Sequence, residues 1–189
     1  MPLPIAHSIT GYAFAAATGV RFRRDTWTAL LFSVVVANLP DLDFIPGTLA
    51  DSPVMYHRTI AHTIPAAILC GLIIGAVLTR FGRRFWEISF LGAFVYSSHL
   101  FADMVNFGGG NIGVQILWPF NDGWYTIKTP LMHSKRGLLQ FHRGSDSQGF
   151  LASFFSVGFF RALLLQGLLF APLLIPAWWI RWKRSAASR

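Results

Sequence analysis

The run Tyr96-Ser-Ser-His-Leu-Phe-Ala-Asp103 places an imidazole and a carboxylate four residues apart within an otherwise apolar segment. Positions i and i+4 of an α-helix lie on the same face, so His99 and Asp103 are predicted to point the same way. A histidine or an aspartate at membrane depth is rare without a partner or a function. The pair therefore predicts either a chelating site or a hydrogen bond that ties helices together.

The composition around this run is that of an integral membrane protein. Of the 189 residues, 53% are hydrophobic and only 13% are charged, and the mean hydropathy is +0.49, which is too apolar for a soluble globule. The length favours a single membrane-embedded domain, residues 1–189. A net charge of +8 would suggest nucleic acid in a soluble protein, but here the basic residues form short clusters beside apolar spans. We therefore expect no nucleic-acid partner.

The apolar segments predict an all-α fold, a polytopic membrane bundle of about five transmembrane or half-spanning helices. The predicted helices cover residues 4–20, 25–39, 64–79, 85–105 and 150–179. Pro40 is expected to end the second helix, and Pro172 and Pro176 interrupt the fifth. Residues 44–56 are predicted to form a loop, and residues 106–149 an external or interfacial lid with aromatic anchors. The first helix precedes a basic cluster instead of following one, so we expect it to be retained and not cleaved as a signal peptide.

Three basic clusters, at residues 21–24, 80–84 and 181–184, fall on the same side of this scheme and mark it as cytoplasmic. The prediction is a multi-pass protein with its N-terminus outside and its C-terminus in the cytoplasm. The same alternation of helices brings seven potential metal ligands to the outer end of the bundle: His7, Asp41, Asp43, His57, His62, His99 and Asp103. Their convergence from four helix ends predicts a functional site on the outer side.

Histidine nitrogen and aspartate oxygen form the donor set of zinc, manganese or iron sites, and Cys70, alone within a helix, excludes a thiolate site. The predicted cofactor is one or two divalent ions, zinc in the first place with manganese or iron as alternatives. The predicted metal ligands are His7, Asp43, His62, His99 and Asp103.

Three residues beside these ligands are predicted to take part in catalysis. Asp41 or His57 would be a general base or would orient a ligand, and Arg58 would hold an anionic oxygen. The alternatives for Arg58 are a lipid headgroup contact or a salt bridge with Asp51. His133 and His142 in the lid could add ligands, although exposed loop histidines are the commoner case.

Several motifs in order resemble the YdjM-like membrane-bound metal-dependent hydrolases, which are predicted bacterial inner-membrane proteins. They are AHSITGY at 6–12, LPDLD at 39–43, HRTIAHT at 57–63, YSSHLFADMVN at 96–106 and LWPF at 117–120. The family normally has a Gly-His-Arg-Gly-type start to its third motif and often a histidine after LPD-x-D, where this chain has Tyr56, Thr59 and Phe44. The resemblance covers about the first 120 residues and implies a hydrolase of the bacterial inner membrane.

More loosely, the order His, Asp, His and then H-x-x-x-D is similar to that of zinc-dependent phospholipase C and single-strand nucleases, phosphodiesterases with clustered zinc ions. This likeness implies that one metal is held by Asp43 or Asp41, His62, His99 and Asp103. It implies a second metal on His7, with Asp103 bridging. A glutamate among that group's later ligands has no counterpart here, because Glu87 is the only glutamate and is predicted on the cytoplasmic side.

The function expected from these features is metal-dependent hydrolysis at the outer face of the membrane, on a phosphoester of a lipid or lipid-linked substrate. An amide or ester hydrolase would use the same ligands. A metal transporter or carrier is the alternative of another class, but it predicts polar residues at successive depths, and the inner halves of the third and fourth helices carry almost none. A structural polar cluster is a third possibility, in which loss of one ligand changes stability and abolishes no reaction.

Overall fold

The computed structural model describes residues 2–20, 26–53, 56–105, 113–127 and 146–186, and this part of the chain is helical with no extended strand. Its helices are α1 (Pro4–Thr18), α2 (Thr26–Asn38), η1 (Leu39–Asp43), α3 (Phe44–Leu49), η2 (Ile60–His62), α4 (Ile64–Thr79), α5 (Phe85–Met104), α8 (Ser147–Ser153), α9 (Val157–Phe170), η3 (Ala171–Leu173) and α10 (Leu174–Ala186). The all-α class predicted from the sequence is confirmed.

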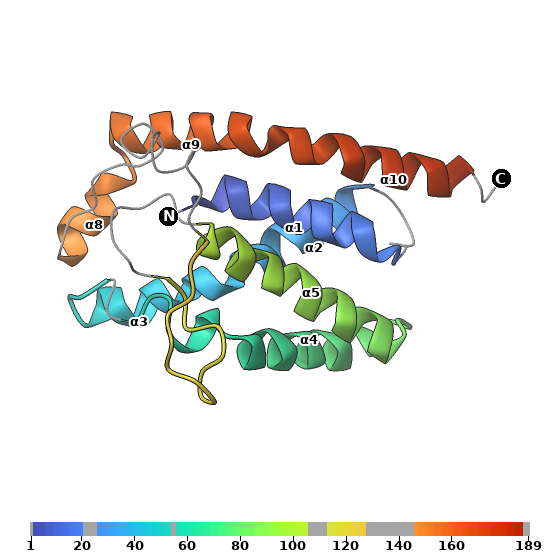
Figure 1. The fold of residues 1–189 in the computed structure, drawn as a ribbon, viewed down its shortest axis with the longest axis horizontal. Coiled ribbons are helices and arrows are strands. Elements are labelled where there is room, and N and C mark those ends of the chain that lie inside the picture. The colour runs from blue at the N-terminus through green and yellow to red at the C-terminus, as the bar shows by residue number, and fades with distance from the viewer. Residues whose placement is uncertain (1, 21–25, 54–55, 106–112, 128–145, 187–189) are drawn as a thin grey trace.

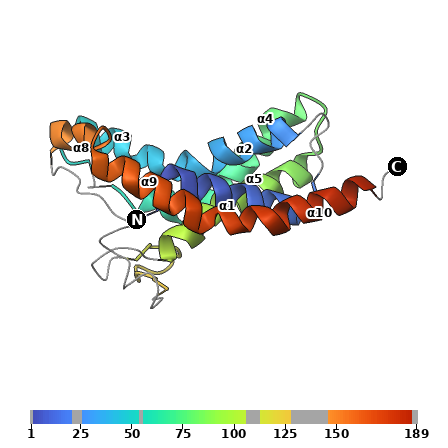
Figure 2. The same ribbon diagram turned by 90° about the horizontal axis from the view of Figure 1, so that it is seen from above.

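The first helix, α1, lies at the centre of the bundle, against α2, α5, α9 and α10 (Figures 1 and 2). Pro4 occupies the first turn, where a missing N–H costs nothing, and Gly19 ends the helix in a left-handed conformation with φ 76°. Arg184 of α10 donates to the Ala16 carbonyl oxygen at 2.9 Å, so the end of α1 is tied to the end of the chain's last helix.

The second apolar segment is longer than predicted. Pro40 lies in the first turn of η1, where its missing N–H does not break a helical hydrogen bond, and the chain continues through η1 into α3. The prediction that residues 44–56 form a loop is therefore wrong for residues 44–49, which are helical. The result is a continuous helical segment, Trp27–Leu49, of 23 residues.

Helices α4 and α5 form a hairpin through a turn at Gly82, whose φ is 74°. Their axes approach closely because glycines replace larger side chains at the contact. A Cβ atom on Gly71 would lie 2.7 Å from the backbone nitrogen of Ala93. Further along, Leu91 and Val95 of α5 pack into the buried apolar core.

The last helical segment also differs from the predicted helix 150–179. Asp146 caps α8 by accepting from the Gly149 N–H, and Ser156 caps α9 by accepting from the Phe159 N–H. The chain thus starts a new helix after α8 instead of continuing straight. From α9 onward, η3 accommodates Pro172, and α9 and α10 run along the whole bundle beside α1 (Figure 1).

Among the described residues, two helical segments are long and apolar enough to cross a membrane, Trp27–Leu49 and Val157–Arg184 with 28 residues. The apolar helix α4 has 16 residues and α1 has 15, below the roughly 20 that a span needs. A polytopic arrangement of five spanning helices is therefore not confirmed. The outer faces of α4 and α9 nevertheless expose large apolar side chains, which suits contact with lipid: Ile68, Leu69, Ile73, Val77, Phe160, Leu164 and Leu168.

Part of the predicted lid is described by the structure, and it ties the turn before α4 to the end of α5. Ile64 donates its N–H to the Ile116 carbonyl oxygen at 2.9 Å, and Ile127 donates to Met104 at 2.6 Å. The remainder of the lid, residues 106–112 and 128–145, lies outside the described residues, and with it the predicted extra ligands His133 and His142.

Candidate metal centre

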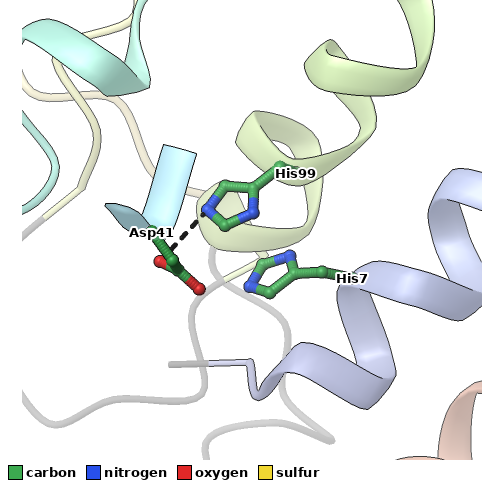
Figure 3. A group of neighbouring side chains, drawn as sticks. All are labelled: His7, Asp41 and His99. Carbon is green, nitrogen blue, oxygen red and sulfur yellow. Dashed lines mark ion pairs between the residues drawn. The ribbon is translucent and has the colours of Figure 1, made fainter. Parts of the chain in front are cut away.

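The predicted ligands come together at one end of the bundle. His7 lies in the first turns of α1, His99 and Asp103 at the end of α5, and the others in η1 and around η2. Figure 3 shows His7, Asp41 and His99 converging from three elements that are far apart in the sequence. Four of the side chains have no solvent exposure: His7, His62, His99 and Asp103.

The carboxylate of Asp103 is the centre of this cluster. Its Oδ1 lies 3.7 Å from His7 Nε2, and its Oδ2 lies 3.5 Å from His62 Nε2 and 3.8 Å from His99 Nε2. Within the described part of the chain, neither oxygen receives a hydrogen bond. A buried carboxylate without hydrogen bonds is costly; the Arg58 guanidinium, 3.4 Å from Oδ2, compensates part of its charge, and a cation among the imidazoles would compensate the rest.

His62 and His99 face each other through their Nε2 atoms, which are 3.0 Å apart. The Nδ1 of His99 donates to the Ala37 carbonyl oxygen at 2.8 Å, and the Nδ1 of His62 lies 3.1 Å from Asp43 Oδ2. When both Nδ1 atoms carry the proton, both Nε2 atoms present lone pairs to the same point. Two lone pairs this close repel unless a cation or a proton lies between them.

His7 completes this group from α1. Its ring stacks on the His99 ring with a centroid distance of 3.7 Å. Neither ring nitrogen of His7 makes a hydrogen bond with any described residue, although the side chain is fully buried. A buried imidazole whose ring nitrogens make no hydrogen bond is available as a metal ligand.

The two aspartates of the LPDLD motif occupy different sides of the histidines. Asp41 Oδ1 lies 3.5 Å from His99 Nε2 and 3.8 Å from His62 Nε2, within the cluster. Asp43 instead lies 3.1 Å from the Nδ1 atoms of both His57 and His62, behind the rings. Asp41 is also the more exposed carboxylate, at 17%, compared with 7% for Asp43.

His57 lies between Asp43 and the ring of Phe44, on which it stacks with a centroid distance of 4.1 Å. Burial lowers the pKa of His57 to about 4, although the hydrogen bond with Asp43 opposes the shift, so this imidazole is neutral at pH 7. Burial also lowers the pKa of His62, but the carboxylates of Asp43, Asp103 and Asp41 outweigh it, and the net shift of this pKa is upward.

Arg58 is buried, and its Nε lies 3.4 Å from Asp103 Oδ2. Its backbone has a positive φ of 67°, which costs a residue with a side chain about 1–2 kcal/mol. Asp51, the alternative partner predicted for Arg58, instead accepts a hydrogen bond from the Ser147 N–H at 2.9 Å. The strained backbone places the guanidinium directly beside the cluster.

The structure adds a positioning contact that the sequence did not single out. Tyr96 of α5 donates its hydroxyl to the Ala61 carbonyl oxygen at 2.7 Å and so holds η2, which carries His62. Tyr96 lies one turn before His99 on the same helix face, and that spacing is the signal that could have identified it.

The donor atoms fit a divalent ion. Three overlapping groups of potential ligands, with donor atoms within 4.8 Å of one another, occur among the described residues: His7, Asp41 and His99; Asp41, His57 and His62; His62, His99 and Asp103. Donors around one tetrahedral zinc ion lie about 3.3 Å apart. The separations here, such as 3.0 Å between His62 and His99 and 3.5 Å between His99 and Asp41, bracket that value.

Comparison with known proteins places the chain in a family. Searches of curated proteins and of solved structures find no match. The family described as YdjM inner membrane protein matches residues 1–173, which include every residue of the cluster. The chain therefore belongs to the YdjM inner membrane protein family.

Proposed function

We propose that the protein is a metal-dependent hydrolase of the bacterial inner membrane that cleaves a phosphoester of a lipid or lipid-linked substrate. The observation that carries the proposal is Asp103, a fully buried carboxylate without hydrogen bonds from the described residues, which faces the Nε2 atoms of three imidazoles. Membership of an inner-membrane family supports the location.

The geometry suggests roles that differ from the sequence prediction at two residues, Asp41 and Asp43. His7, His62, His99 and Asp103 remain the proposed ligands. Asp41 joins them, because its Oδ1 faces the Nε2 atoms of His62 and His99. Asp43, predicted as a ligand, is proposed to orient the Nδ1 side of His62 and so to present Nε2 to the ion.

A zinc ion or a pair of ions bound here would supply Lewis acidity and lower the pKa of water toward 7. Asp41 would bind the ion through Oδ1, and its second oxygen, Oδ2, is proposed to accept the proton of the attacking water. His57 is neutral and lies 3.9 Å from Asp41, where it can orient that carboxylate. Arg58 is proposed to hold a phosphoryl oxygen. This role favours a phosphoester substrate over an amide or a carboxyl ester, which the same metal ligands could also help to hydrolyse.

The surroundings of the cluster favour a substrate that arrives from the lipid phase. Asp41 and Asp43 belong to the segment Trp27–Leu49, which is long enough to span a membrane. Beside them, Leu42 and Ile45 expose more than half of their side chains, and Ile60 of η2 is 61% exposed. The basic cluster at residues 80–84 follows α4 and the cluster at 181–184 lies in the last turns of α10, both at the helix ends away from the site, and by the positive-inside rule this supports a site on the outer face.

Hydrolysis by the purified protein in mixed micelles tests the proposal, followed as the released alcohol or phosphomonoester for phospholipids and as released phosphate for isoprenoid phosphates. We expect hydrolysis with bound zinc, loss of at least about 100-fold after chelation, and recovery when zinc is returned. The control is Asp51→Asn, which changes an aspartate outside the cluster and should keep full activity. Hydrolysis that survives complete removal of metal would contradict the proposal, as would the absence of any hydrolysis with the metal bound.

A further inference from the structure

Gln166 is a fully buried polar side chain in the middle of α9, within the apolar segment Val157–Arg184. Its Oε1 accepts a hydrogen bond from the backbone N–H of Leu3 at 2.6 Å. This bond joins residues that are 163 positions apart in the sequence. A polar side chain in a membrane-spanning segment is expensive to bury, so its retention here indicates a role.

The hydrogen bond leads directly to the cluster through Leu3, the residue that precedes α1. The carbonyl oxygen of Leu3 accepts from the N–H of Ala6 at 2.9 Å and from the N–H of His7 at 3.3 Å. Gln166 therefore holds the peptide N–H of Leu3, the residue whose carbonyl oxygen, in the next peptide group, accepts the first hydrogen bonds of α1. Leu3 itself is buried at 1% exposure, so no water replaces this bond.

His7 depends on its backbone more than the other histidines do. Ala37 accepts a hydrogen bond from Nδ1 of His99, and Asp43 Oδ2 lies 3.1 Å from Nδ1 of His62, whereas the ring nitrogens of His7 have no described polar atom this close. Stacking on His99 orients the His7 ring, and Asp103 Oδ1 lies 3.7 Å from its Nε2, beyond hydrogen-bond distance. A small shift in the first turn of α1 would therefore move Nε2 of His7 away from Asp103.

We propose that Gln166 is a positioning residue for the metal centre, which holds the start of α1 so that His7 can bind the ion; this inference rests on the proposed metal site. Helix α9 thereby supports the site through the start of α1. The packing agrees, because a Cβ on Gly167, the next residue, would lie 3.2 Å from Ile5 in the same turn of α1.

Zinc affinity of the purified protein, measured by competition with a chromophoric chelator, tests this role. The variants are Gln166→Leu, which removes the acceptor and keeps an apolar side chain of similar size, and Gln166→Glu, which keeps an oxygen acceptor. The matched control is Ser33→Ala. Ser33 is equally buried in α2, which also packs on α1, but its hydroxyl donates to Ala29 in its own helix.

We expect Gln166→Leu to weaken zinc binding by about tenfold, as loss of a group that orients a ligand typically does. Gln166→Glu should keep most of the wild-type zinc affinity. Ser33→Ala should bind like wild type. In a His7→Ala background, Gln166→Leu should add no further loss, because the effect passes through His7. An additive loss in that background, or wild-type affinity in Gln166→Leu, would overturn the inference.

Hydrogen exchange of the peptide that contains residues 3–12 separates this inference from the proposed function. In metal-free protein, Gln166→Leu should increase exchange in this peptide and Ser33→Ala should not. If wild-type protein binds no zinc but Gln166→Leu still exchanges faster than wild type in this peptide, the metal site is overturned and the Gln166 anchor stands. Unchanged exchange in Gln166→Leu would overturn the anchor itself.

Discussion

Replacing Asp103 by asparagine is expected to abolish metal binding and to reduce hydrolysis by at least about 100-fold, which corresponds to about 2.7 kcal/mol. The carboxylate lies within 3.5–3.8 Å of three imidazole Nε2 atoms and is fully buried. An asparagine keeps the shape of the side chain but removes the negative charge and turns two N–H donors toward these atoms. Metal content and hydrolysis, measured on the same preparation, check both effects.

The Asp103→Asn variant also leaves the buried Arg58 guanidinium beside a neutral amide, so part of the loss could come from unfolding. Circular dichroism and gel filtration in detergent therefore accompany the assay. The control is Asp51→Asn, which neutralises an aspartate that binds Ser147 outside the cluster. A folded Asp103→Asn protein that keeps its metal and its activity contradicts the assignment of Asp103.

The second large effect is expected at Arg58. Arg58→Gly should lower the hydrolysis of a phosphodiester by about 100-fold or more, the cost of removing one preorganised donor from a developing charge. Glycine accepts the positive φ of 67° without strain, so the backbone of the turn is preserved. Metal binding should persist, because the bound cation neutralises the negative charge of Asp103 in place of the guanidinium.

Two comparisons make the Arg58 result specific. Arg58→Lys keeps the charge but loses the forked donor, so its activity should fall between wild type and Arg58→Gly. Arg80→Gly, at the exposed end of α4, should have no effect. Equal losses on a phosphodiester and on a neutral carboxyl ester would show that Arg58 does not act on a phosphoryl oxygen.

The gathering of the ligands at one end of the bundle could be predicted from the sequence, because alternating helix directions place helix starts and ends on common sides. The motif residues His7, His62, His99 and Asp103 do lie together. The path of the chain after Pro40 could not be predicted in the same way. A proline ends a helix in some settings and starts a new turn in others, and the choice here depends on the packing of η1 against α5 and η2.

The positions of Asp41 and Asp43 relative to the histidine rings also could not be predicted from the sequence. The two residues are separated by one position, and only the 3₁₀ turn decides that Asp41 faces the Nε2 atoms while Asp43 lies behind the rings. Gln166 stands out in the sequence as a polar residue in an apolar run, but its partner could not be predicted, because the backbone of Leu3 carries no motif.

Plasma mass spectrometry of wild-type protein purified without chelator shows whether this cluster is a metal site. We expect about one to two equivalents of zinc or manganese per chain. Folded, metal-free protein that takes up no zinc would contradict this expectation. The contact between His62 and His99 would then hold a proton, with imidazolium His62 donating to both Asp43 and His99.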